Sequence, residues 1–290
     1  MATGGDDWDP FCAGDTGLSK ESRERIQKVD MKRFFEEKSL EPYIYVYFDE
    51  DDMAKVHVLA VGERCTPYYG GFFYFVVRFP HNYPQDPPKV KLMNTGGGRV
   101  RFNPNIYING KVCHPILGTW SEKSWKPENQ LFDVLLEIQA MLNERPFENE
   151  PDPFHPGFPF PELPGNDMSK YNDVIRHETL RVAVCDMLEP GTVVMPEEMR
   201  TKIKDIFFDN YKDYIGICKK NNHLNDIKLD DHDPFGHITV KMGLADHVWN
   251  FNSHPRDGNF DYHSIQERIQ KIKQEVDKER ERSVLNDWLP

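Results

Sequence analysis

Residues 66–90 decide the fold, and they read TPYYGGFFYFVVRFPHNYPQDPPKV. An aromatic and β-branched run at residues 71–79 predicts a strand, and the proline-bearing segment at residues 80–88 ends it. Similar extended segments occupy residues 43–48, 55–61 and 89–93. Four strands in quick succession without intervening helices form an antiparallel meander, so we predict an α+β fold.

Two amphipathic helices flank the predicted sheet. Residues 18–38 are charged, contain no Gly or Pro, and place Ile26, Val29 and Phe34 on one face. After the strands, Pro127 suits a first helical turn, and residues 131–142 keep a helical apolar stripe. The second helix should pack on the sheet.

A proline-rich segment divides the chain. Residues 151–164 hold six prolines in fourteen positions, which excludes regular structure and indicates a semi-rigid connection. We therefore expect four parts: a disordered acidic N-terminus (1–18), a core (19–150), a proline-rich connection (151–168) and a helical extension (169–290).

The extension should contain three helices, at residues 169–188, 196–220 and 260–282. In the last, Ile265, Ile269, Ile272 and Val276 are spaced by 4, 3 and 4 residues. This spacing fits a coiled-coil seam, but it is more typical of a helix packed on its own domain.

Composition excludes several classes of protein. The net charge of −12 opposes binding to a phosphate backbone, so we expect no nucleic-acid partner. The longest apolar run, residues 72–77, is far shorter than the ~20 residues of a membrane-spanning helix. The acidic start does not resemble a signal peptide, so we expect a cytoplasmic and nuclear protein.

Five cysteines are present, an odd number without zinc-clamp or dithiol spacing. We therefore expect free thiols, no metal site and no cofactor. Cys185 lies in an apolar helical run and should be buried, as should Cys218. Cys113 instead lies in an irregular Gly/Asn/Pro segment, where a buried role is less natural.

That irregular segment, residues 99–126, includes FNPNIYINGKVCHPILGTW at residues 102–120. The chain carries an ordered series of motifs: the stretch at residues 66–90, then Asn103-Pro104-Asn105, then Cys113 eight residues on, then Trp125 and Pro127. Together they resemble the ubiquitin-conjugating enzymes over residues 22–151. KYNDVIRHETLRVAVCDML, at residues 170–188, extends the likeness to the Z type of that family, which carries a C-terminal helical extension.

The resemblance implies the ubiquitin-conjugating fold and a carrier reaction. Ubiquitin, or a ubiquitin-like modifier, would pass from an activating enzyme to Cys113 as a thioester and then to a lysine of a target. A cysteine suits this task, because a thiolate is a good nucleophile and a thioester is a good acyl donor. Asn105 is where the family places the side chain that steadies the oxyanion or orders the loop. An asparagine that merely satisfies its own turn is the alternative.

The resemblance assigns further roles around Cys113. Asn149 and Glu150 match the acidic gate that handles the incoming lysine, although a single loop carboxylate is often only solvated. Pro115 stands where the family usually has Asp or Ser, and its neighbour His114 is a more remote candidate for a local base.

Partners follow from the same resemblance. Arg25, Lys28 and Lys32 form a basic stripe on the first helix, where the family docks the activating enzyme; a solvated helix face is the alternative. In the Z type of vertebrates the donor is the alternative activating enzyme. Gln85 and Glu128 occupy the loops that face ubiquitin ligases.

Two other functions remain open at this point. A catalytically weak ubiquitin-binding module of the same fold would lack the cysteine. A cysteine hydrolase would need partners for Cys113, and no hydrolase motif surrounds that residue.

Overall fold

The structure is a computed structural model that describes residues 8–12, 17–36, 40, 42–119, 124–149, 165–229 and 258–287. Contacts divide the chain into two compact units. The first comprises Met1–Tyr68 and Phe73–Pro159, and the second comprises Tyr69–Phe72 and Phe160–Pro290.

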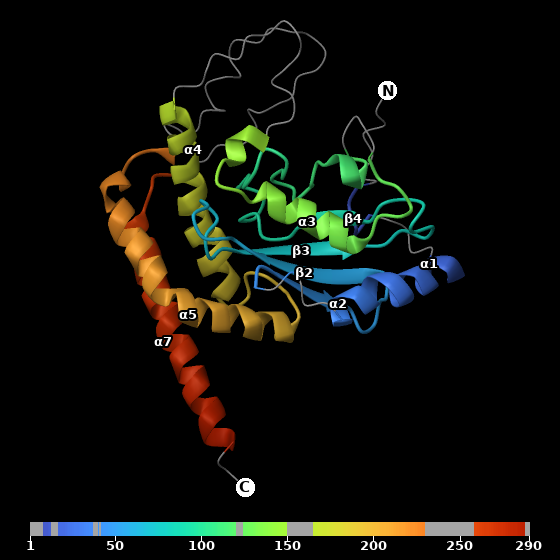
Figure 1. Ribbon diagram of the computed structural model, residues 1–290. Coiled ribbons are helices and arrows are strands. Elements are labelled where there is room, and N and C mark those ends of the chain that lie inside the picture. Colours follow the sequence, from blue (N-terminus) through green and yellow to red (C-terminus); the bar gives the residue numbers. More distant parts are fainter. Residues whose placement is uncertain are drawn as a thin grey trace, which may run out of the picture. The chain divides into compact units, whose positions relative to one another are not determined.

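The first unit is built on a four-stranded sheet of order β1-β2-β3-β4 (Figure 1). The strands are β1 (Ile44–Phe48), β2 (Lys55–Val61), β3 (Phe72–Arg78) and β4 (Lys89–Leu92). The outer pairs, β1 with β2 and β3 with β4, are antiparallel. The predicted meander and α+β class are confirmed, with strand ends that differ by at most one residue from the predicted ones.

One continuous helical segment precedes the sheet. It comprises α1 (Lys20–Arg25), η1 (Ile26–Met31), which is a π-helical turn, and α2 (Lys32–Glu36). Its N-terminus is capped by Ser19, whose hydroxyl accepts a hydrogen bond from the N–H of Ser22 at 3.0 Å. Ile26 is fully buried, as the predicted apolar face requires.

Helix α3 (Leu131–Met141) follows the sheet and buries Leu131, Val134, Leu135 and Ile138. The prediction that Pro127 stands in the first helical turn is wrong. Gln130 is the N-cap, and Asp133 completes a capping box by accepting from the N–H of Gln130 at 2.9 Å. This box sets the start of the helix four residues after Pro127. Two short 3-10 turns, η2 (Pro115–Leu117) and η3 (Pro146–Asn149), lie in the loops on either side.

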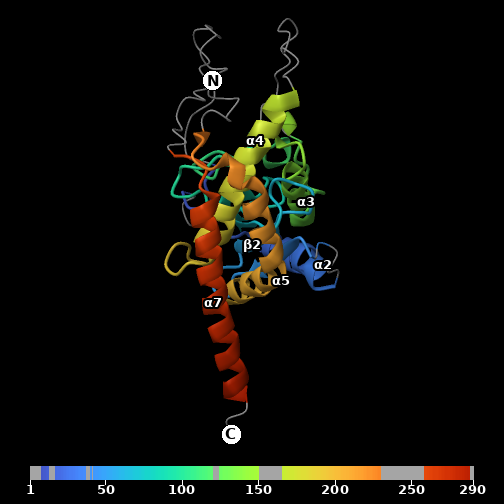
Figure 2. The same cartoon turned by 90° about the vertical axis from the view of Figure 1, so that its left-hand side faces the viewer.

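The second unit is helical. Its elements are α4 (Gly165–Glu178), η4 (Thr179–Asp186), α5 (Glu197–Asn221), η5 (Asn222–Leu224) and α7 (Tyr262–Asp287). Both α5 and α7 are long and lie side by side in Figures 1 and 2. The stripe from Ile265 to Val276 is buried, so α7 packs within its own unit, as the predominant interpretation of its spacing predicted.

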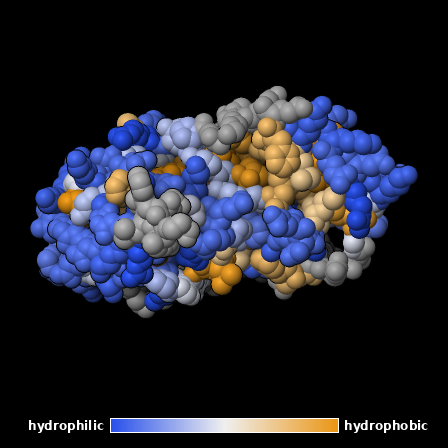
Figure 3. Space-filling view, turned by 90° about the horizontal axis from the view of Figure 1, so that it is seen from below, coloured by the Kyte–Doolittle hydropathy of each residue, from blue (hydrophilic) through white to orange (hydrophobic). Residues whose placement is uncertain are grey.

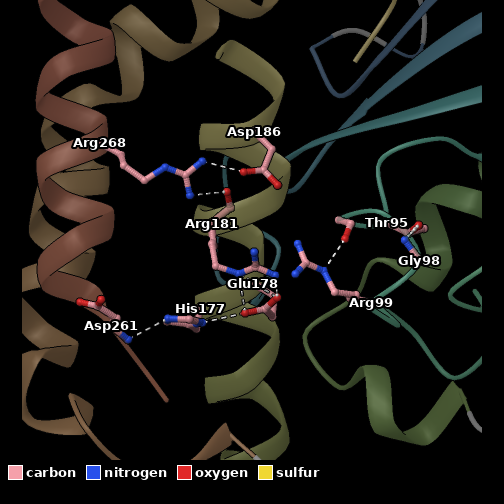
Figure 4. Close-up of polar contacts among 10 residues, drawn as sticks. Thr95, Gly98, Arg99, His177, Glu178, Arg181, Asp186, Asp261 and Arg268 are labelled. Carbon is pink, nitrogen blue, oxygen red and sulfur yellow. Dashed lines mark hydrogen bonds and ion pairs between the residues drawn. The ribbon is translucent and has the colours of Figure 1, made fainter. Parts of the chain in front are cut away.

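A buried polar network fixes the junction between α4 and η4 (Figure 4). His177 Nδ1 lies 2.8 Å from Glu178 Oε1, and His177 Nε2 accepts from the N–H of Asp261 at 3.0 Å. His177 therefore carries its hydrogen on Nδ1 and donates it to Glu178. Burial alone would raise the pKa of Glu178, but hydrogen bonds from His177 and Arg181 hold it at about 2.

The short segment Tyr69–Phe72 belongs to the second unit and is held there by two tyrosines. The hydroxyl of Tyr69 donates to Asn210 at 3.0 Å, and that of Tyr214 donates to the Gly70 carbonyl at 2.8 Å. Gly70 has a φ of +70°, and a Cβ there would lie 2.6 Å from the Tyr214 ring. Only glycine fits this position.

The face that Figure 3 shows is largely hydrophilic on one side and exposes hydrophobic side chains in patches on the other. Within the described part of the chain, none of the helices combines the length and apolar character needed to cross a membrane.

Candidate active site

Cys113 follows a tight turn that is pinned to β4. The N–H of Leu92 donates to the carbonyl of Gly110 at 2.9 Å, three residues before Cys113. Gly110 has a φ of +86°, and a Cβ there would lie 2.2 Å from the Leu92 carbonyl oxygen. The turn therefore depends on glycine at this position.

Asn103 organises the loop that contains the Asn-Pro-Asn sequence. Its side chain is fully buried and donates to the Tyr68 hydroxyl at 3.1 Å and to the Met141 carbonyl at 2.8 Å. Its amide oxygen accepts from the N–H of Asn105 at 2.9 Å. These contacts support a loop-shaping role for Asn103.

A main-chain hydrogen bond connects Asn105 to Cys113. Its carbonyl accepts from the N–H of Cys113 at 2.7 Å. The side-chain Oδ1 is buried and has no hydrogen-bond partner among the described residues. No hydrogen bond to this oxygen from the described residues therefore fixes the orientation of the amide.

Cys113 is buried, with 4% of its surface exposed, contrary to the expectation from its loop sequence. Thr119 explains the difference, because the Cys113 thiol donates to the Thr119 carbonyl at 3.2 Å. The Thr119 hydroxyl also donates to Val112 O at 2.8 Å and accepts from the N–H of His114 at 2.9 Å. The Gly/Asn/Pro segment thus folds back over its own cysteine.

His114 uses both ring nitrogens within the loop. Nδ1 accepts from the N–H of Ile116 at 3.3 Å, and Nε2 lies 3.4 Å from Glu137 Oε2 on α3. Burial lowers the pKa of His114, and the Glu137 carboxylate offsets this only in part. Because Nδ1 caps η2 and Nε2 faces Glu137, both ring nitrogens are engaged within the fold, which does not favour a role for His114 as a base.

Of the predicted acidic gate, Asn149 and Glu150, the structure describes only Asn149. Glu150 lies outside the described residues. The side chain of Asn149 donates to the Met141 carbonyl at 2.7 Å and accepts from Asn143 at 3.0 Å. Asn149 therefore fixes the loop that follows α3.

The three residues of the basic stripe differ in their surroundings. Arg25 turns toward the loop before α3 and donates to the Asn129 carbonyl at 2.9 Å. Lys28 is exposed and pairs with Glu24 at 2.8 Å, one turn away. Lys32 is exposed. The stripe therefore presents two exposed cations beside one that also has a structural role.

Gln85 and Glu128, the predicted ligase-facing residues, are both exposed. Their loops are joined by Trp125, whose indole N–H donates to the Pro84 carbonyl at 2.8 Å. Sequence reasoning placed the two residues in separate loops, and this bond links those loops.

Asp30 is a residue that the sequence analysis missed. It is buried in the first helix, and its carboxylate accepts from the Leu131 N–H at 2.8 Å and from the Tyr83 hydroxyl at 2.9 Å. An acidic residue four positions after Ile26, on the apolar face, was the available signal.

Residues 8–12, inside the segment expected to be disordered, pack against the sheet edge. Asp9 is buried and forms an ion pair with Lys91 of β4. The Lys91 ammonium lies 5.5 Å from the ring centroids of both Trp8 and Phe11, and that of Lys111 lies 5.8 Å from Trp8.

No group of three or more His, Cys, Asp or Glu side chains suited to a metal ion occurs among the described residues.

Comparison with known proteins places this site in context. Residues 27–157 match a family described as "Ubiquitin-conjugating enzyme". The chain is 40% identical to "Ubiquitin-conjugating enzyme E2 Z" of Xenopus tropicalis over 96% of this chain and 80% of that protein. It is also 40% identical to the Homo sapiens protein of the same name, over 93% of this chain and 68% of that protein. "Putative ubiquitin-conjugating enzyme E2 38" of Arabidopsis thaliana is 32% identical over 68% of this chain and 59% of its own length.

Proposed function

Because the chain belongs to the ubiquitin-conjugating enzyme family, we propose that its thioester carrier is Cys113. The observation that carries this proposal is the set of hydrogen bonds that surrounds that cysteine. The Cys113 N–H donates a hydrogen bond to the Asn105 carbonyl, and the Cys113 thiol donates one to the Thr119 carbonyl. The turn at Gly110, just before the cysteine, is hydrogen-bonded to β4. The other buried cysteines, Cys185 and Cys218, lie in helices, and burial raises the pKa of Cys185 and that of Cys218, the latter to about 12. Both are therefore poor nucleophiles at neutral pH.

The transfer of ubiquitin through Cys113 proceeds in two steps. In the first, the Cys113 sulfur attacks the thioester carbonyl that joins ubiquitin to the activating enzyme. A new carbon–sulfur bond forms, the old one breaks, and the thiol proton ends on the departing cysteine of the activating enzyme. In the second, a neutral lysine amine attacks the Cys113 thioester, an amide forms, and the Cys113 thiol is regenerated with a proton from the amine.

Asn105 supplies the polar group for the second step. Attack by the amine places negative charge on the carbonyl oxygen, and an amide N–H aimed at it stabilises the transition state. The main-chain hydrogen bond from the Cys113 N–H to the Asn105 carbonyl supports this role, because it keeps Asn105 beside the cysteine. We further propose Glu150 as the group that receives the lysine.

Ubiquitin, an activating enzyme and ubiquitin ligases are the general partners of the family. We propose that Arg25, Lys28 and Lys32 dock the activating enzyme, and that Gln85 and Glu128 face ligases. The likeness to the Z type over nearly the whole chain supports the alternative activating enzyme as donor.

We also propose that residues 19–150 are the catalytic core and residues 169–290 an extension to it. A cytoplasmic or nuclear location fits five cysteines that are all free thiols.

A charging assay tests the assignment of Cys113. Incubation with activating enzyme, ATP and ubiquitin should give a thiol-sensitive adduct with the wild type. Cys113→Ser should give a thiol-resistant oxyester that fails to transfer, and the exposed Cys65→Ser control should charge normally. A thiol-sensitive adduct on a folded Cys113→Ala protein would overturn the assignment.

A further inference from the structure

Thr119 contacts the main chain on both sides of Cys113. Its hydroxyl donates to the carbonyl of Val112 at 2.8 Å and accepts from the N–H of His114 at 2.9 Å. The His114 carbonyl also lies 3.2 Å from the same hydroxyl. One side chain therefore fixes the residue before Cys113 and the residue after it.

The main chain of Thr119 contacts the thiol itself. The Thr119 carbonyl accepts from Cys113 Sγ at 3.2 Å. With this bond in place, only 4% of the Cys113 surface is exposed. The resting thiol is therefore held against the loop that follows it.

We propose that Thr119 is a positioning residue for the transfer of ubiquitin to Cys113, holding the free thiol in place and releasing it when the thioester forms. This inference rests on the proposed role of Cys113. Thr119 touches neither ubiquitin nor the reacting carbonyl in this role; it acts through the main chain of residues 112–114.

The chemistry of the carrier step explains the release. A thiol has one hydrogen to donate, and that hydrogen leaves when the carbon–sulfur bond to ubiquitin forms. The thioester sulfur then has only lone pairs to present to the Thr119 carbonyl oxygen, so the attractive contact is lost. The hydroxyl bonds to Val112 and His114 do not depend on the thiol hydrogen and persist in the charged enzyme.

Two substitutions distinguish the effect of the Thr119 hydroxyl from the effect of the rest of its side chain. Thr119→Val keeps the shape and removes the hydroxyl, whereas Thr119→Ser keeps the hydroxyl and removes the methyl group. Thr179→Val is a matched control, because the Thr179 hydroxyl is also buried but has no hydrogen-bond partner among the described residues.

The first readout is the rate at which iodoacetamide alkylates Cys113, followed by mass spectrometry of the peptide that contains it, since Cys12 and Cys65 are exposed and also react. Loss of a hydrogen bond corresponds to roughly a fivefold change in an opening equilibrium. We expect Thr119→Val to be alkylated about fivefold faster, and Thr119→Ser and Thr179→Val to match the wild type.

The second readout is charging by activating enzyme at varied enzyme concentration. Thr119→Val should lower the maximal rate without changing the concentration for half-maximal rate, because docking uses the first helix. Thr119→Ser should restore the rate. A merely structural effect would lower the fraction of folded protein instead, which thermal melting detects.

The outcomes distinguish this inference from the proposed function. If Cys113→Ala does not charge but Thr119→Val has wild-type alkylation and charging, the inference is wrong and the carrier assignment stands. If Cys113→Ala forms the thiol-sensitive adduct, both are wrong. If Thr119→Val does not fold, Thr119→Ala is compared with Thr119→Ser at a temperature where both are folded, and equal alkylation rates overturn the inference.

Discussion

The carboxylate of Asp30 accepts a hydrogen bond from the backbone N–H of Leu131, 101 positions later in the chain, at 2.8 Å. This bond ties the first helix to the first residue of α3. The Tyr83 hydroxyl donates to the same carboxylate, so the loop between β3 and β4 is tied to it as well.

Loss of the Asp30 carboxylate should destabilise the protein. Asp30→Ala leaves the Leu131 N–H and the Tyr83 hydroxyl buried without an acceptor, which we expect to lower the free energy of unfolding by about 2–4 kcal/mol. Asp30→Asn keeps one acceptor oxygen and should lose less. Urea denaturation at pH 7 measures both, and equal losses would contradict this account.

The same site should give a defined pH dependence. Burial raises the pKa of Asp30 above its ordinary value of 3.8, against the lowering effect of the bonds from Leu131 and Tyr83. The folded state therefore holds the proton more tightly, and this contribution to stability declines as pH rises from about 4 through the raised pKa. Asn does not titrate, so the stability of Asp30→Asn should not decline in this way. Its free energy of unfolding relative to that of the wild type should therefore increase with pH over that range.

Asn105→Ala should charge with ubiquitin at nearly the wild-type rate but discharge to free lysine ~10²-fold more slowly. The reason is that the amide acts when negative charge develops on the carbonyl oxygen. Single-turnover discharge of the purified thioester measures this step. Asn109→Ala is the control, because Asn109 lies in the same loop and is exposed. Equal slowing of charging and discharge would indicate a general loop defect.

Glu137→Gln should lower the pKa of His114 further. Burial already lowers this pKa below 6.5, and the Glu137 carboxylate is the group that raises it. A titration of the His114 ring protons by NMR measures the change, with the urea-unfolded protein as a reference near ~6.5. An unchanged or raised His114 pKa in the variant would show that the two side chains do not interact.

Gln85→Phe/Glu128→Ala should increase stimulation by ordinary RING domains. Covering a carboxylate or amide with an apolar groove costs a few kcal/mol unless the partner offers a donor, so the wild type should respond weakly. Discharge of the charged enzyme is followed while RING domains are titrated. Gln270→Phe/Glu275→Ala, with the same substitutions on exposed positions of α7, should behave as wild type. Strong stimulation of the wild type, unchanged in the double variant, would refute the prediction.

Glu178 should make the second unit sensitive to acid. Its folded pKa of about 2 lies below the ordinary 4.5, so its contribution to stability is complete above about pH 5 and is lost as pH falls toward 2. Glu178→Ala leaves Arg181 without its buried partner and should lower stability by roughly 3–5 kcal/mol at pH 7. Thermal melting from pH 7 to pH 3 should show a smaller pH dependence for the variant than for wild type.

The sequence predicted what is local and periodic. The four strands and the long helices follow from period and composition, whereas the proposal of Cys113 and Asn105 as site residues rests on an ordered motif. The sequence did not predict the burial of Cys113, because the thiol contacts the main-chain carbonyl of Thr119, and such a contact leaves no pattern in the sequence. The start of α3 was missed because a capping box at Gln130 and Asp133 prevailed over Pro127.

The packing of residues 8–12 has a consequence for the enzyme's selectivity toward its own amines. Lys91 and Lys111 lie on the strand and turn that lead to Cys113, and a lysine must be neutral and accessible to accept ubiquitin. Asp9 forms an ion pair with Lys91, and the Trp8 ring centroid lies 5.5 Å from the Lys91 ammonium and 5.8 Å from that of Lys111. We therefore expect that these contacts limit self-modification, and that removing residues 1–12 directs ubiquitin onto these two lysines.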